Sequence, residues 1–163
     1  MNVFLSYAVG ELDAPIAARL RAVAAAYEIS IVLPDRSYVP NNGLSQDTNA
    51  KIMQSDAVLA LITRTAQLEL LNVVNLELRL ASQFYKPIMA LIEQGVPFQG
   101  IPENQIVYFD RFNPTAHEES LIRALNQLQA ERQQWKNNLT ALGWIAGITL
   151  GLIALSEWIG DKK

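Results

Sequence analysis

A single carboxylate, Glu77, lies in an apolar stretch of the chain, NLELRL at residues 75–80. Glu77 and Arg79 are the only charged residues between Glu69 and Lys86. A helix with one face in water would have several charges on that face, so Glu77 is either an ordinary edge residue or a group that points into a cleft. A carboxylate in a cleft can stabilise a developing positive charge. Only in the second case would Glu77 be a catalytic residue.

The composition excludes several other kinds of site. The chain has 163 residues, no cysteine and one histidine, His117, which excludes disulfides, cysteine nucleophiles and multi-histidine metal sites. We expect no metal and no cofactor. The net charge of −3 and the lack of a long basic run argue against binding to nucleic acid.

The elements that must position Glu77 are predicted by hydrophobic patterning. Short apolar runs predict strands, and runs with helical spacing predict helices between them, one of which contains Glu77. Because strands and helices alternate, we expect an α/β fold with a five-stranded parallel sheet in the flavodoxin-like order 2-1-3-4-5. The predicted strands are 2–7, 29–33, 57–62, 87–92 and 106–109. The predicted helices are 11–28, 45–56, 65–85 and one that a capping box of Thr115 and Glu118 begins and that runs through 121–135.

Ligands of such sheets bind beyond the carboxyl ends of the strands. That edge would be lined by Ser6 and Tyr7, by the loop at 34–43 and by the segment after Ile62. The loop is dense in Pro, Asn and Gly, which is typical of turns.

Four stretches in this order resemble a bacterial TIR (Toll/interleukin-1 receptor) domain over residues 1–130. VFLSYA at 3–8 is similar to the first TIR box, and RSYVPNNGL at 36–44 occupies the place of the loop after the second strand. IMQSDAVLALIT at 52–63 and NLELRLASQFYKPIMALIE at 75–93 are similar to later TIR stretches. Nucleoside deoxyribosyltransferases share the later motifs, but the Ser-Tyr pair and the apolar tail favour the TIR family.

The resemblance implies an activity and a site. Many TIR domains cleave the nicotinamide–ribose bond of NAD with a glutamate that Glu77 matches, so NAD would be a substrate and not a cofactor. The residues that we expect to bind it are Ser6, Tyr7, Arg36, Tyr38 and Asn42. The chain departs from the family at Val73 and Val74, where a Trp and a Cys are often found.

The tail predicts a membrane anchor at residues 139–159. From Leu139 to Leu155 there are 17 residues without a charge, and the full segment reaches about 31 Å as a helix, which matches the hydrocarbon core of a bilayer. We expect a single-pass protein of the cell inner membrane with its TIR domain in the cytoplasm. The predicted divisions are a TIR domain at 1–130, a helical connector at 131–138, the transmembrane helix and a short tail at 160–163.

Three glycines recur at four-residue spacing in this segment, at Gly143, Gly147 and Gly151. They fall on one helix face, where small residues allow helices to approach closely in lipid. This pattern predicts self-association through the transmembrane helix, in addition to contacts between TIR domains.

Two classes of function fit the sequence. The first is a membrane-anchored enzyme that hydrolyses or cyclises NAD, as an antiphage immune effector or signal generator. The second is a non-enzymatic effector or adaptor that oligomerises through its TIR and glycine contacts, with possible disruption of the membrane. Glu77 favours the first class, and the missing Trp favours the second.

Overall fold

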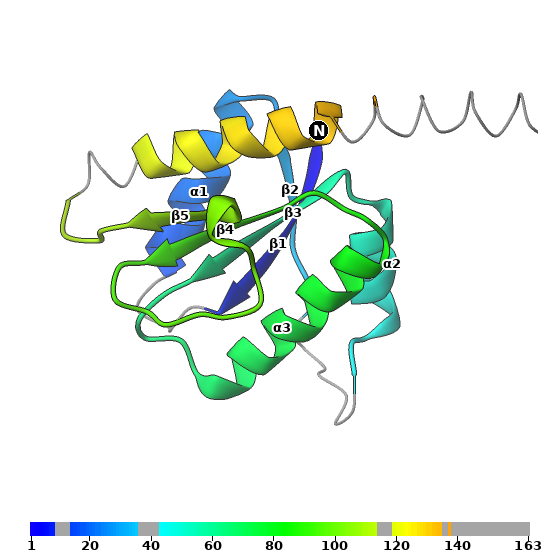
Figure 1. Ribbon diagram of the computed structural model, residues 1–163, viewed down its shortest axis with the longest axis horizontal. Coiled ribbons are helices and arrows are strands. Elements are labelled where there is room, and N and C mark those ends of the chain that lie inside the picture. Colours follow the sequence, from blue (N-terminus) through cyan, green and yellow to red (C-terminus); the bar gives the residue numbers. More distant parts are fainter. Residues whose placement is uncertain (9–13, 36–42, 114–118, 135–136, 138–163) are drawn as a thin grey trace, which may run out of the picture.

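The structure, a computed structural model, describes residues 1–8, 14–35, 43–113, 119–134 and 137. A five-stranded sheet lies at its centre, with helices on both faces (Figure 1). A further helix spans residues 119–134. The elements in chain order are β1 (Asn2–Ala8), α1 (Ala14–Ala26), β2 (Ser30–Val32), α2 (Gln46–Gln54), β3 (Ala57–Ile62), α3 (Leu68–Gln83), β4 (Ile88–Glu93), the 3-10 turn η2 (Glu103–Gln105) and β5 (Ile106–Phe109).

The sheet has the predicted topology. Its strand order is β2-β1-β3-β4-β5, and every neighbouring pair is parallel. All residues of β3 and β4 are buried, which agrees with their uninterrupted apolar sequences. The α/β class and the strand order are therefore confirmed.

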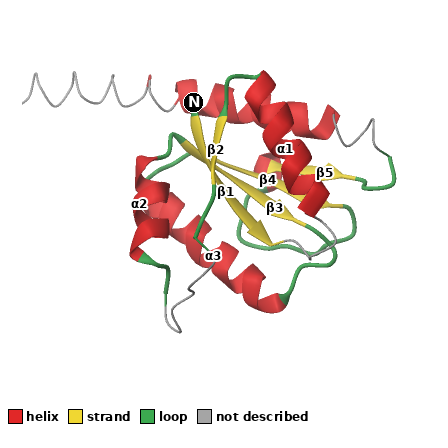
Figure 2. Cartoon of the chain, turned by 180° about the vertical axis from the view of Figure 1, so that it is seen from behind, coloured by secondary structure: helices red, strands yellow, loops and turns green. Residues whose placement is uncertain are grey.

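Two apolar layers cover the two faces of the sheet. One layer contains odd-numbered side chains of β1, such as Val3 and Leu5, and packs under α1 and the 119–134 helix. The other contains even-numbered side chains, such as Phe4 and Ala8, and packs under α2 and α3. The two pairs of helices lie on opposite sides of the sheet (Figures 1 and 2). The alternation along β1 therefore decides which helices each of its side chains meets.

The helix ends agree with local sequence signals. Ser45 caps α2 as predicted, because its side chain accepts a hydrogen bond of 3.1 Å from the backbone N–H of Thr48. The prediction placed the end of α3 too late. The helix stops at Gln83 because Tyr85 adopts a left-handed conformation with a φ of 53°.

The predicted membrane anchor lies outside the described residues, as do the 160–163 tail and the three glycines of the predicted stripe. Among the helices that the structure does describe, none combines the length and the apolar character needed to cross a bilayer.

Candidate functional site

Glu77 and Ser6 meet in the interior, between α3 and β1. The hydroxyl of Ser6 donates a hydrogen bond of 2.5 Å to Oε2 of Glu77. Both residues are 0% exposed. A buried carboxylate lowers the free energy of unfolding unless hydrogen bonds replace its lost hydration. The Ser6 hydroxyl supplies one such bond and fixes the orientation of the carboxylate.

Small side chains on the sheet leave room for this carboxylate. Ser6 is in register with Ala60 of β3, which is in register with Ala90 of β4. All three lie at even positions of their strands, on the face that α3 covers. On the helix, Glu77 is buried together with Val73, Val74, Leu78 and Ala81. The helix therefore turns Glu77 inward, toward a row of small residues.

The structure places the other predicted site residues differently. Tyr7 follows Ser6 on β1 and packs against the apolar layer on the opposite face. Its side chain is thus not brought together with Glu77. Arg36, Tyr38 and Asn42 lie outside the described residues. Of the predicted binding residues that are described, Ser6 is the one in contact with the glutamate.

A second buried carboxylate, Glu93, lies at the carboxyl end of β4. It accepts hydrogen bonds from two nitrogens of Arg111, one of them at 2.5 Å from Nε, and one of 2.7 Å from the backbone N–H of Arg64. The side chain of Arg64 is 57% exposed, and its Nε lies 3.7 Å from Oε1 of Glu93. Two guanidinium groups thus share one carboxylate.

The surroundings of Glu93 act on its pKa in opposite directions. Burial raises the pKa, while the hydrogen bonds and charges of Arg111 and Arg64 lower it, and the net effect is a pKa below the usual range. Glu93 is therefore ionised and paired at neutral pH.

Sequence reasoning missed this cluster, although a signal was present. Glu93 is the last residue of β4. Arg64 lies two residues after the end of β3, and Arg111 lies two residues after the end of β5. Because the carboxyl ends of parallel strands meet at one edge, three charges placed at or just after the ends of three neighbouring strands are expected to come together.

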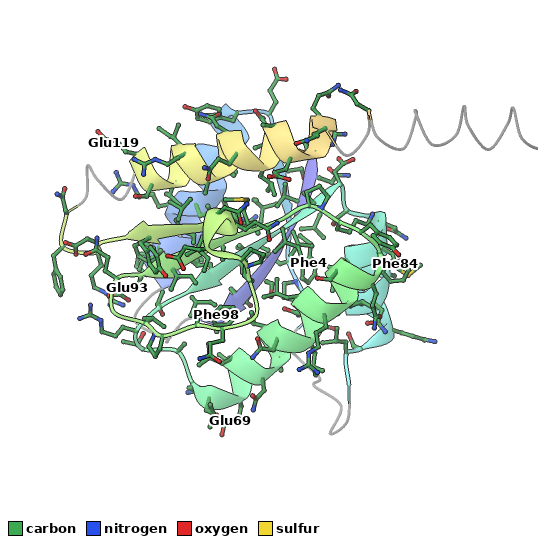
Figure 3. All side chains as sticks on the ribbon, viewed as in Figure 1. Phe4, Glu69, Phe84, Glu93, Phe98 and Glu119 are labelled. Carbon is green, nitrogen blue, oxygen red and sulfur yellow. The ribbon has the colours of Figure 1, made fainter. Side chains whose placement is uncertain are left out.

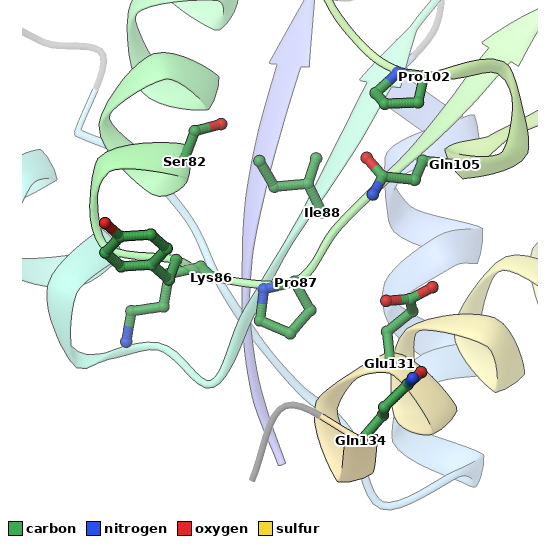
Figure 4. Close-up of a pocket in the computed structure, with 9 residues that line it drawn as sticks. Ser82, Lys86, Pro87, Ile88, Pro102, Gln105, Glu131 and Gln134 are labelled. Atoms are coloured by element: carbon green, nitrogen blue, oxygen red, sulfur yellow. The ribbon is translucent and has the colours of Figure 1, made fainter. Parts of the chain in front are cut away.

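Two adjoining hollows lie at the other edge of the sheet, where the strands begin. Their volumes are about 550 and 670 Å³, and both are lined by Ser82, Ile88, Pro102 and Gln105. The first also reaches Tyr85 and the end of the 119–134 helix at Gln134. Its lining comes from α3, the start of β4 and that helix (Figure 4). Neither hollow includes Glu77 or Ser6 in its lining.

Comparisons with known proteins find likeness to solved structures only. No model of a protein family matches the sequence, and no curated protein matches it. Among solved structures, the chain is similar to the TIR domains of the activated Roq1 resistosome directly recognizing the pathogen effector XopQ. That match has a TM-score of 0.44 and 13% identity, and it covers 85% of this chain and 98% of that chain. The chemistry of this chain must therefore be argued from its own residues.

Proposed function

We propose that the chain is a TIR-type enzyme that cleaves the nicotinamide–ribose bond of NAD, with Glu77 as its catalytic carboxylate. The observation that supports this most strongly is the fully buried contact between Glu77 and Ser6. An apolar side chain at position 77 would pack in this layer without the penalty of burying a charge. Residues that reduce stability in this way concentrate at functional sites, where the chemistry requires them.

In the proposed reaction the bond between the nicotinamide nitrogen and the ribose carbon breaks, and its electron pair leaves with nicotinamide. Nicotinamide departs as a neutral molecule, so a strong general acid is not required. The positive charge that develops on the ribose is stabilised by the carboxylate of Glu77. Attack by water gives ADP-ribose and a released proton, whereas attack by the adenine of the same molecule gives a cyclic product. The Ser6 hydroxyl is a positioning group for the carboxylate in either case.

Substrate must reach a carboxylate that is 0% exposed in this structure. The enzyme therefore requires an opening step before the reaction. In the proposal this step accompanies assembly of TIR domains, which the predicted glycine stripe at residues 143–151 promotes by association of transmembrane helices. Anchoring in the inner membrane, with the TIR domain in the cytoplasm, adds to the local concentration of domains.

Arg64 is the proposed partner of the pyrophosphate of NAD. Ser6 of β1 pairs with Ala60 of β3, and Ala60 pairs with Ala90 of β4. Ala90 lies three residues before Glu93 on the same strand. At about 3.3 Å per residue and about 4.8 Å between strands, the Cα atoms of Ser6 and Glu93 are roughly 14 Å apart. An extended dinucleotide can span this separation. The exposed guanidinium of Arg64 suits a phosphate group.

The test is nicotinamide release from NAD by the full chain in membranes, measured by chromatography. We expect release by the wild type and a loss of about 10³-fold in Glu77→Gln, the scale found when one stabilising group is removed from a transition state. Gln retains the shape of Glu and an oxygen that accepts the Ser6 hydrogen bond, so the fold is preserved. Glu69→Gln, at the start of the same helix, is the matched control and should keep full activity. Equal release by wild type and Glu77→Gln would contradict the catalytic role.

A second candidate function is a non-enzymatic effector or adaptor in antiphage defence. It is favoured by Val73 and Val74, which are both buried in α3 where TIR enzymes often have an aromatic residue and a cysteine. Aliphatic side chains there provide no platform for stacking a base. This candidate predicts no release of nicotinamide by the wild type, together with defence activity that survives Glu77→Gln and is lost when the glycine stripe is disrupted.

A further inference from the structure

We infer that the amino edge of the sheet, where the strands begin, rests on the surface of the membrane, so that the edge with Glu93 and Arg64 faces away from it. This inference depends on the membrane anchor of the proposed function and does not depend on catalysis. The occupant of the surface is the headgroup layer of the bilayer. The side chains that meet it are Met53 and Tyr85, with Tyr27 and Phe84 beside them.

The topology places these four residues at one edge. In a parallel sheet with crossover helices, every connection from a helix to the next strand lies at the amino edge. Tyr27 is in the connection from α1 to β2, Met53 is in the last turn of α2, and Phe84 and Tyr85 connect α3 to β4. Three separate segments at this edge, two connections and the last turn of α2, thus each expose a large side chain that is aromatic or apolar. Lys86 joins two of them, because its ammonium donates to the carbonyls of Met53 and Ser55 at 2.8 and 2.7 Å.

Tyr85 is exposed at a position that suits glycine better. Its φ of 53° lies in the left-handed region, and the N–H of Lys86 donates to the carbonyl of Ala81 at 3.0 Å, as in the turn that ends many helices. The side chain of Tyr85 is 79% exposed, so packing within the domain does not explain a tyrosine here. A conformation that disfavours any side chain, combined with an exposed aromatic ring, points to a role outside the domain. Amphipathic aromatic rings are enriched where membrane meets water.

The chain leaves the described domain at this same edge. Tyr85 and Gln134 line one hollow, and Arg132 donates a hydrogen bond of 2.9 Å to Asp56, just before β3. Five residue steps separate Gln134 from the predicted start of the membrane span at 139, and they reach at most about 18 Å. Tyr85 therefore lies at the edge from which, in the proposal, the chain continues toward the bilayer.

The opposite edge supplies matched controls. Phe112 follows β5 and is 80% exposed, and Leu68 begins α3. Both lie at the carboxyl edge, so the inferred orientation holds them in the cytoplasm. Figure 3 shows the separation between the two edges, with Phe84 and Glu93 on opposite sides of the molecule. If exposure alone brought side chains to lipid, Phe112 would reach it as readily as Tyr85.

The absence of cysteine from the chain allows single-site labelling. The full chain, with Tyr85→Cys, Met53→Cys or Phe112→Cys, is labelled with a fluorophore and reconstituted in vesicles of phosphatidylcholine and phosphatidylglycerol. Some of the lipids have a nitroxide quencher in the headgroup. We expect quenching at positions 85 and 53 that is at least twice the quenching at 112. Thermal melting of each variant confirms folding, and Tyr85→Gly should melt no lower than the wild type because it relieves the left-handed conformation.

The other outcomes overturn the inference. Equal quenching at 85 and 112, or none at either, in protein that floats with the vesicles would reject this orientation and leave the anchor intact. A chain that does not float with vesicles would reject both the orientation and the anchor. Spontaneous disulfides between Tyr85→Cys copies without lipid quenching would show that a second copy occupies the surface. Nicotinamide release is measured separately, so its absence would reject catalysis alone.

Discussion

The two edges of the sheet use charged groups in different ways. At the carboxyl end of β1 and β4, carboxylates are enclosed within the protein, Glu77 against Ser6 and Glu93 against Arg111. At the amino edge, charged groups instead tie elements together while large apolar side chains such as Tyr85 remain exposed. Connections at the amino edge are structural, whereas those at the carboxyl edge are free to supply ligand groups. The difference suggests that the carboxyl edge is arranged for chemistry and the amino edge for docking.

The largest effect should come from separating chemistry from stability at Glu77. In the double variant Ser6→Ala/Glu77→Met, both hydrogen-bonding partners become apolar, which can be neutral or stabilising in a buried site. We expect nicotinamide release to fall by about 10³-fold. We expect the free energy of unfolding to stay within about 1 kcal/mol of the wild type or to rise. Chemical denaturation and the release assay, both on the full chain, measure the two quantities.

The single variant Glu77→Met is the control for this experiment, because it leaves the Ser6 hydroxyl buried without its acceptor. It should be less stable than the double variant by about 1 to 2 kcal/mol. Full activity in the double variant would show that the buried pair is a structural feature of the core.

The next largest effect should come from the paired carboxylate at the same edge. Glu93→Gln removes the charge that two guanidinium groups share, and breaking such a pair costs about 3 kcal/mol of unfolding free energy. The pKa of Glu93 is lowered in the folded protein, so its contribution is complete above the ordinary value of 4.5 and is lost as pH falls through the lower folded value. Stability measured from pH 7 to pH 3 should therefore fall more steeply in the wild type than in Glu93→Gln. Parallel curves would contradict the pairing.

A smaller effect is expected at Arg64, and it should appear in KM. If this guanidinium binds the pyrophosphate, Arg64→Gln should raise KM for NAD about tenfold, which corresponds to about 1.4 kcal/mol, the scale of one hydrogen bond to a charged group. KM for nicotinamide riboside, which has no phosphate, should be unchanged. Arg64→Lys keeps the charge, so its KM for NAD should lie between the values for the wild type and for Arg64→Gln. An equal rise in KM for both substrates would assign Arg64 to the fold alone.

The sequence predicted the fold because the information is local. Apolar strands such as AVLALI at 57–62 are buried on both faces, and a helix lies between successive strands in most of the chain. The predicted ends of strands and helices were less accurate where contacts between distant segments determine where an element ends. β2 covers only Ser30–Val32 because its pairing with β1 extends over three residues. The end of α3 depends on the backbone conformation of Tyr85, which periodicity does not encode.

The candidate site was predicted only in part, and the catalytic role of Glu77 stays a prediction. Glu77 became a candidate through its contrast with apolar neighbours and through the family resemblance, but α3 is apolar nearly all round, so its inward face was not evident. That face is set by the small residues Ser6 and Ala60 on the sheet, which come from distant parts of the chain. The Glu93 cluster was missed because it joins three segments that are far apart in sequence.

The smallest effect is expected at the amino edge, where Arg132 pairs with Asp56. The guanidinium donates to Oδ1 of Asp56 at 2.9 Å, and both side chains are about one quarter exposed. Water screens such a pair, so Arg132→Gln should lower the free energy of unfolding by only about 0.5 kcal/mol. Asp56→Asn should cost more, because Oδ2 of Asp56 also accepts from the backbone N–H of Asn2 at 2.9 Å, at the start of β1. Denaturation curves of the two variants show which loses more free energy of unfolding. A loss above 2 kcal/mol in Arg132→Gln would show that the amino edge depends on buried charge, as the carboxyl edge does.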